Sequence, residues 1–200
     1  MLPPVRLAYI SSSVAGRSTR PLAVMKASRV IGAVGVLCGT VDAIAGSVSF
    51  PGAVDRTKDP TGRFEIRWSK SYGSSPHHLS FAGPIDSSAA PFMEFDRSVT
   101  IHWSPSGDAF AVTDRAGSDN YHVLVFKVPP TQAIQLIPAL PSHVRALVQE
   151  NHHAYVEVVA WTPQGLAIHA YGYGDRSPKG FSAYVQCRER RETWHCRQTS

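Results

Sequence analysis

The sequence predicts a mainly β protein built from antiparallel meanders in an open sheet arrangement. Short apolar runs with a period of two recur along the chain, as in Val99-Thr-Ile-His-Trp103, and this period is typical of strands. Turns rich in Gly, Pro, Ser and Asp separate the runs. One segment has helical spacing instead: behind an expected N-cap at Ser142, apolar residues recur at i, i+3 and i+4, which predicts a short helix over 142–150.

The stretch 99–128 gives the clearest meander. Its first strand, 99–103, alternates apolar and polar residues and is expected to bury one face. Pro105 and Gly107 then predict a turn, because proline fixes φ and lacks a ladder donor while glycine tolerates positive φ. Strands are expected to follow over 109–113 and 121–128.

The same criteria predict strands elsewhere in the chain. They fall at 64–68, 79–82, 92–95, 155–161, 166–171 and 181–187, with a last one inside 188–199. Four prolines within 129–141 exclude a long helix there.

Residues 1–45 are interpreted as a leader and signal peptide. Translation is expected to start at Met25, where Lys26 and Arg29 precede an uncharged run over 30–41, and cleavage is expected after Ala45. Retention as a membrane anchor is the alternative, although the run is shorter than the ~20 residues of a spanning helix. We therefore expect a periplasmic or secreted protein without a stable membrane span after cleavage.

Residues 46–62, rich in Gly, Pro and charge, are predicted to form a flexible tether before a single β-rich domain over 63–200. Loss of residues 1–45 leaves 15 basic and 14 acidic side chains, so the net charge falls from +5 to +1. Nucleic acid is therefore not an expected partner. The arginines of 188–197 are interpreted as pairing with the neighbouring Glu189 and Glu192.

One turn sequence occurs twice. Trp103-Ser-Pro-Ser-Gly107 recurs as Trp161-Thr-Pro-Gln-Gly165, so Trp103, Pro105 and Gly107 correspond to Trp161, Pro163 and Gly165 at an offset of 58 residues. Each copy lies between apolar β runs, and an Asp-Arg pair follows each: Asp114-Arg115 and Asp175-Arg176. The segment 64–82 contains no such turn. This pattern predicts an internal repeat of strand, turn, strand, loop and strand.

At these residues the chain resembles the TolB-type β-propeller repeat, whose first strand ends in a Trp-Ser-Pro-Asp-Gly turn. The resemblance implies a partial propeller-like arrangement and an exported binding platform. Ser106 and Gln164 replace the turn aspartate, and the offset exceeds the ~40 to 45 residues of common blades. Two or three units cannot close a ring, which needs at least about four. Either the meander stays open under the 142–150 helix, or a homo-oligomer completes it.

Cys187 and Cys196 would be the only cysteines of the exported chain. Such a pair in an exported protein predicts a structural disulfide. A redox-active pair is the alternative, but the spacing is not Cys-x-x-Cys.

No catalytic, metal or cofactor motif is present. Serine-nucleophile, phosphate-loop and dinucleotide patterns are absent from the sequence, and neither histidine doublet has chelating spacing. A distributed metal site using His102, His122 or His169 is the open alternative. Recognition is expected in the loops that carry the Asp-Arg pairs, and the predicted binding residues are Asp114, Arg115, Asp119, Asp175 and Arg176.

These observations favour an exported, non-enzymatic binding module of the cell envelope with a protein or glycan partner. Two alternatives remain. One is a secreted hydrolase or metal-dependent enzyme that uses loop His and Asp residues. The other is a small inhibitor stapled by its disulfide.

Overall fold

The computed structural model describes residues 46–70, 76–84, 88–174 and 177–199. The described chain is mainly β, with antiparallel pairing in every sheet and one α-helix, as the sequence predicted. The predicted leader and signal peptide, 1–45, lie outside the described residues.

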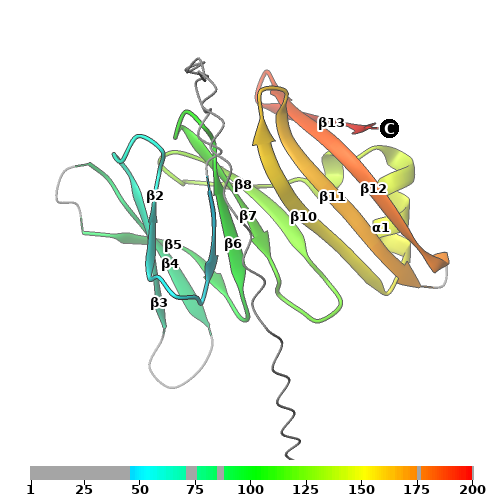
Figure 1. Ribbon diagram of the computed structural model, residues 1–200, viewed down its shortest axis with the longest axis horizontal. Coiled ribbons are helices and arrows are strands. Elements are labelled where there is room, and N and C mark those ends of the chain that lie inside the picture. The colour runs from blue at the N-terminus through cyan, green and yellow to red at the C-terminus, as the bar shows by residue number, and fades with distance from the viewer. Residues whose placement is uncertain (1–45, 71–75, 85–87, 175–176, 200) are drawn as a thin grey trace, which may run out of the picture. The chain divides into compact units, whose positions relative to one another are not determined.

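Three sheets make up the described fold, and Figure 1 shows the central sheet between the other two. The first sheet has the order β2 (Arg56–Lys58), β3 (Glu65–Lys70), β4 (His77–Ala82), β5 (Ala90–Phe95). The central sheet has the order β1 (Ser47–Phe50), β6 (Val99–Trp103), β7 (Ala109–Asp114), β8 (His122–Lys127), β9 (Ala133–Gln135). The last sheet has the order β10 (His153–Thr162), β11 (Gly165–Gly174), β12 (Ser177–Arg190), β13 (Thr193–Thr199). A 3-10 turn, η1 (Ile137–Ala139), and α1 (Ser142–Glu150) connect the central and last sheets.

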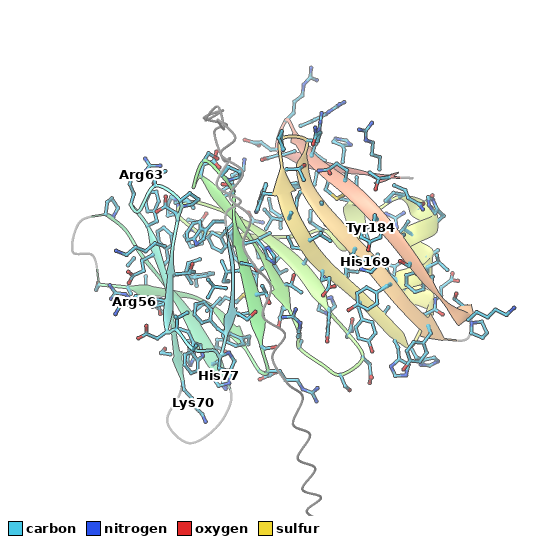
Figure 2. The ribbon with its side chains drawn as sticks, in the orientation of Figure 1. Arg56, Arg63, Lys70, His77, His169 and Tyr184 are labelled. Carbon is cyan, nitrogen blue, oxygen red and sulfur yellow. A yellow bond between two sulfur atoms is a disulfide. The ribbon has the colours of Figure 1, made fainter. Side chains whose placement is uncertain are left out.

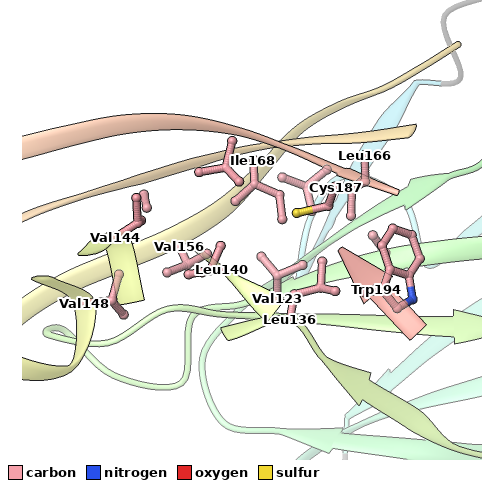
Figure 3. Packing of buried hydrophobic residues seen from close by; sticks show 14 of the residues in the cluster. Val123, Leu136, Leu140, Val144, Val148, Val156, Leu166, Ile168, Cys187 and Trp194 are labelled. Atoms are coloured by element: carbon pink, nitrogen blue, oxygen red, sulfur yellow. The ribbon is translucent and has the colours of Figure 1, made fainter. Parts of the chain in front are cut away.

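The two faces of the central sheet belong to two different hydrophobic cores. On one face Phe110 and Phe126 join residues of the first sheet, including Ile66. On the other face Val123 and Val125 join the inner face of the last sheet and the buried side of α1. Figure 3 shows this second core, where residues of α1, β8, β10, β11 and β12 meet. The period of two in each strand is what lets one sheet supply both cores.

Strand β6 is buried on both faces, whereas the sequence predicted one. Thr100 is 7% exposed and His102 is 8% exposed, although both are polar. The last sheet covers this second face, and the Trp161 indole N–H donates to the His102 carbonyl oxygen over 2.8 Å. Thr100 and His102 are therefore buried where two sheets pack together. The alternation within 99–103 does not predict this contact between sheets.

The predicted tether over 46–62 is wrong, because this segment supplies two strands. β1 pairs antiparallel with β6, and the Phe50 side chain is fully buried in the first core. β2 pairs with β3 and buries Thr57. The β-rich unit therefore begins before residue 63, and the segment is held by residues that lie far from it in sequence.

A third copy of the repeated turn lies in that segment. Each sheet has an x-Pro-x-Gly turn between two neighbouring strands, with the glycine at positive φ (72°, 72° and 116°). The three turns are Asp59-Pro-Thr-Gly62, Ser104-Pro-Ser-Gly107 and Thr162-Pro-Gln-Gly165. They join β2 to β3, β6 to β7 and β10 to β11. The internal repeat therefore has three units in this structure, and its shared residues are the proline and the glycine.

The first side chain of each turn caps it. The Asp59 carboxylate accepts from the Phe64 N–H over 2.6 Å, and the Ser104 hydroxyl accepts from the Ala109 N–H over 3.1 Å. The Thr162 hydroxyl accepts from the Gln164 N–H, also over 3.1 Å. Asp, Ser and Thr can each take this position because each offers an oxygen to a backbone donor within the turn or two residues after it.

The helix and the disulfide form where the sequence predicted them. Helix α1 occupies 142–150, but Pro141 is its N-cap and accepts from the Arg145 N–H over 2.9 Å, so Ser142 is the first helical residue. Cys187 and Cys196 face each other across β12 and β13 and form a disulfide. Of the helices that the structure describes, none combines the length and hydrophobicity that crossing a membrane requires.

Candidate functional site

A cleft of about 570 Å³ opens between the x-Pro-x-Gly turns of the central and last sheets. Strand ends from both sheets line it as well. The lining residues that matter for its chemistry are Ser104, Ser106, Asp108, Lys127, Trp161, Gln164, Arg188, Glu189 and Trp194. The cleft exists because two equivalent turns approach each other where the sheets pack.

Two tryptophans form the apolar part of the cleft. Trp161 lies directly before the turn of the last sheet, as Trp103 lies directly before the turn of the central sheet. Trp103 is 1% exposed, whereas Trp161 is only partly buried. The Trp194 ring lies 6.3 Å from the Trp161 ring, in an edge-on arrangement. The Trp194 indole N–H is buried and has no hydrogen-bond partner among the described residues. A buried donor without a partner is unusual in a folded protein, and the indole N–H groups of Trp68 and Trp103 are in the same state.

Carboxylates and cations form the polar part. The hydroxyls of Ser106 and Ser104 donate to Asp108 over 2.5 and 2.9 Å. These bonds, the Ser106 bond first, lower the pKa of Asp108 below 3.8 against the opposing effect of burial. The cleft therefore has a fixed, ionised acceptor on its central-sheet side.

An ion pair joins the two sheets at the cleft. Lys127 of β8 lies 2.7 Å from Glu189 of β12. The hydrogen bond to Glu189 and the charge of Glu189 raise the pKa of Lys127. Beside this pair, the Arg188 guanidinium donates through Nε to the carbonyl oxygen of Gln164, so the last turn and β12 are tied together.

The predicted Asp-Arg site at Asp114 and Arg115 lies at the end of β7, not at the cleft. Arg115 donates to the Thr100 hydroxyl over 2.6 Å and lies 3.9 Å from the Glu157 carboxylate. Burial raises the pKa of Asp114, while the charge of His122 opposes this effect. The ion pair between Arg115 and Glu157 links the central sheet to the last sheet.

The rest of that loop also contacts the last sheet. Asp119 lies 3.0 Å from His153 Nδ1, and the Ala154 N–H donates to the Asp119 carbonyl oxygen over 3.2 Å. Tyr155 donates its hydroxyl to the Ser118 carbonyl oxygen. Asp175 and Arg176, the predicted partners from the second copy, lie outside the described residues.

The three histidines of the alternative metal site lie on β6, β8 and β11. Burial, aided by the charge of Arg115, lowers the pKa of His102 to about 4. His169 Nε2 is hydrogen-bonded to the Ser182 hydroxyl over 2.9 Å. Within the described ranges, no group of three or more His, Cys, Asp or Glu side chains is placed to hold a metal ion.

Sequence reasoning found Trp161 and its turn but assigned them to the fold alone. It missed Asp108, Lys127, Glu189 and Trp194 as cleft residues. The duplicated turn was the available signal for the cleft, because the two copies, at 104–107 and 162–165, lie close together in the packed sheets and both line it. Comparison with known proteins adds no identity, because no family model, curated protein or solved structure matches the chain.

Proposed function

We propose that the protein is an exported, non-enzymatic binding module of the cell envelope that holds a sugar residue of a glycan partner in the cleft. The observation that carries this proposal is the pairing of two indoles with ionised acceptors around one cleft. A sugar presents apolar C–H faces and hydroxyl donors together, so it matches a site with aromatic surface and a few placed polar groups.

The polar groups suit hydroxyl binding. Asp108 is ionised, and Glu189 is held by Lys127, so both carboxylates can accept from sugar hydroxyls. The exposed guanidinium of Arg188 offers donors to ring or hydroxyl oxygens.

Two further observations support export and a TolB-type relationship. The disulfide is of the kind that persists in oxidising compartments such as the periplasm. Three antiparallel sheets, each with its x-Pro-x-Gly turn, support an open propeller-like repeat as the origin of the fold.

The test is a binding titration of the purified protein with maltotriose, cellotriose and chitotriose, measured by calorimetry. We expect saturable binding of at least one trisaccharide without release of cleaved products. Glu189→Gln, which removes a charged acceptor and keeps the side-chain size, should weaken that binding by about tenfold or more, because hydrogen bonds to charged groups contribute about 1.5 to 3 kcal/mol.

Glu65→Gln is the matched control, since Glu65 is also an ion-paired strand carboxylate, 2.5 Å from Arg67 on the first sheet. It should leave the affinity unchanged. The proposal fails if no trisaccharide binds, or if the two variants weaken binding equally. Turnover of a trisaccharide would instead support the hydrolase alternative.

A further inference from the structure

A second pocket, of about 220 Å³, lies on the hairpin of β12 and β13. Its lining is basic and contains no carboxylate. The lining residues are Gln186, Arg188, Arg190, His195, Cys196 and Arg197. Arg188 also lines the cleft, but the other five do not.

Strand alternation creates this concentration of charge. Arg188 and Arg190 lie two residues apart and so share one face of β12, while Glu189 lies on the other face and pairs with Lys127. The predicted pairing of these arginines with Glu189 is therefore wrong. A glutamate that is adjacent in sequence is on the opposite side of the sheet.

The register brings His195 and Arg197 of β13 to the same face. Arg188 lies opposite His195, and Gln186 lies opposite Arg197. A tight turn joins the strands, with Arg191 and Glu192 at φ 49° and 66°. The adjacent disulfide cross-links the two strands, so the pocket is held by covalent structure.

The guanidinium groups of Arg190 and Arg197 have no ion-pair or hydrogen-bond partner among the described residues. Arg197 lies diagonally across the ladder from Arg188, and like charges at such positions destabilise a sheet unless a counter-ion is present. Guanidinium forks match the planar or tetrahedral oxygens of carboxylate, sulfate and phosphate.

Aromatic residues continue this face of the last sheet. Tyr184 precedes Gln186 by two residues and is 54% exposed. His169 stacks against Tyr184 with ring centroids 4.4 Å apart and against Tyr171 with centroids 4.6 Å apart. Figure 2 shows His169 and Tyr184 side by side on the last sheet. His169 therefore covers one face of Tyr184 and one face of Tyr171, and a base cannot stack on those faces.

This arrangement distinguishes two classes of polyanion. Single-stranded nucleic acid is bound through bases that stack on free aromatic faces. Ring edges and phenol hydroxyls instead suit hydrogen bonding to the hydroxyl and acid groups of a polysaccharide.

We propose that the outer face of the β12–β13 hairpin is a binding site for an acidic polysaccharide. A carboxylate or sulfate of the polymer sits in the arginine pocket, and the neighbouring sugars run along β12 toward Tyr184. The site shares only Arg188 with the lining of the cleft, and it goes beyond the proposed function because it takes an acidic group through residues that do not line the cleft.

The experiment measures affinity of the full protein for polygalacturonate, dextran sulfate and uncharged dextran by biolayer interferometry. We expect both acidic polymers to bind and dextran not to bind, with affinity falling as salt rises. The double variant Arg190→Gln/Arg197→Gln should weaken binding to the acidic polymers at least tenfold. Binding to only one of the two would identify its acid group as the ligand chemistry and support the site.

The matched control is Arg56→Gln/Arg63→Gln, which removes two positive charges from exposed positions on and beside the first sheet, remote from the hairpin in Figure 2. It should change affinity by less than twofold. Equal losses in the two double variants would mean that net charge alone drives binding and would overturn the proposal. Absence of binding to either acidic polymer, or tighter binding of a single-stranded oligothymidylate, would also overturn it.

Discussion

Gly107, in the turn of the central sheet, lies against the turn of the first sheet. It has φ 72°, and a Cβ built on it would lie 2.5 Å from the Asp59 carboxylate of the first-sheet turn. Asp59 is only 3% exposed, and hydrogen bonds from Thr61 and Phe64 lower its pKa below 3.8 despite the opposing effect of burial. Two copies of the repeated turn are therefore packed together at this point.

Replacing this glycine tests that contact. Gly107→Ala should lower the free energy of unfolding by about 1 to 3 kcal/mol, because it combines a left-handed backbone with a steric conflict. Urea unfolding measures the change. Gly117→Ala is the control, since its nearest added contact is an ordinary 3.7 Å, and we expect a change within about 0.5 kcal/mol. Equal effects would contradict the packing of the two turns.

His102 gives the fold a pH dependence. Its pKa is about 4 in the folded protein, because burial and the Arg115 charge disfavour the imidazolium, against 6.5 when unfolded. The folded pKa is depressed, so the unfolded chain takes up the proton first as pH falls. The contribution to stability is complete above pH 6.5 and is lost progressively toward pH 4.

We therefore expect the unfolding free energy to fall by about 2 kcal/mol between pH 7 and pH 5, measured by urea unfolding at each pH. His102→Gln should reduce this decline, because the glutamine does not titrate. A decline of the same size in the variant would assign the effect to other groups.

At the scale of elements, β1 shows most directly how the structure departs from the predicted tether. Phe50→Ala should cost about 3 to 5 kcal/mol, because it removes a fully buried aromatic side chain from the first core. Thermal or urea unfolding measures this loss. Val54→Ala, at a position that is 48% exposed, should change stability little. If Phe50→Ala leaves the free energy of unfolding unchanged, the segment is a tether rather than part of the core.

The strands that the sequence predicted have their own apolar alternation, as β6 and β8 do, and the 142–150 helix has its own apolar face. β1 and β2 were missed because they have only four and three residues and are paired with β6 and β3, which lie later in the chain. The third turn escaped notice because no tryptophan precedes it: Thr57 and Lys58 lead into Asp59-Pro60. The missed strands β1, β2 and β9 are the shortest, with four, three and three residues, whereas the edge strands β5, β10 and β13 were predicted.

The candidate cleft was only partly predictable for a related reason. Trp161 belongs to a repeated motif and is visible in the sequence. Lys127 and Glu189 lie on strands of different sheets and meet only when those sheets pack. Arg115, one of the predicted binding residues, is ion-paired with Glu157 of the last sheet and donates to Thr100 of β6.

At the scale of the whole molecule, the central sheet couples the other two because each of its faces belongs to a different core. We expect one cooperative unfolding transition in calorimetry. Val125→Ala and Phe110→Ala, which act on opposite faces, should each shift that whole transition to lower temperature. Two separable transitions, each sensitive to only one of the variants, would contradict the coupling.

The most direct test of the cleft as a ligand site follows the four tryptophan indole N–H resonances by NMR. The protein is titrated with whichever of the three trisaccharides binds most tightly. Trp161 and Trp194 line the cleft, whereas Trp103 is buried in the first core and Trp68 packs against that core from the first sheet. The account predicts that the Trp194 and Trp161 resonances shift with saturation while those of Trp68 and Trp103 stay in place. Shifts confined to Trp68 or Trp103, or no shift at saturation, would contradict it.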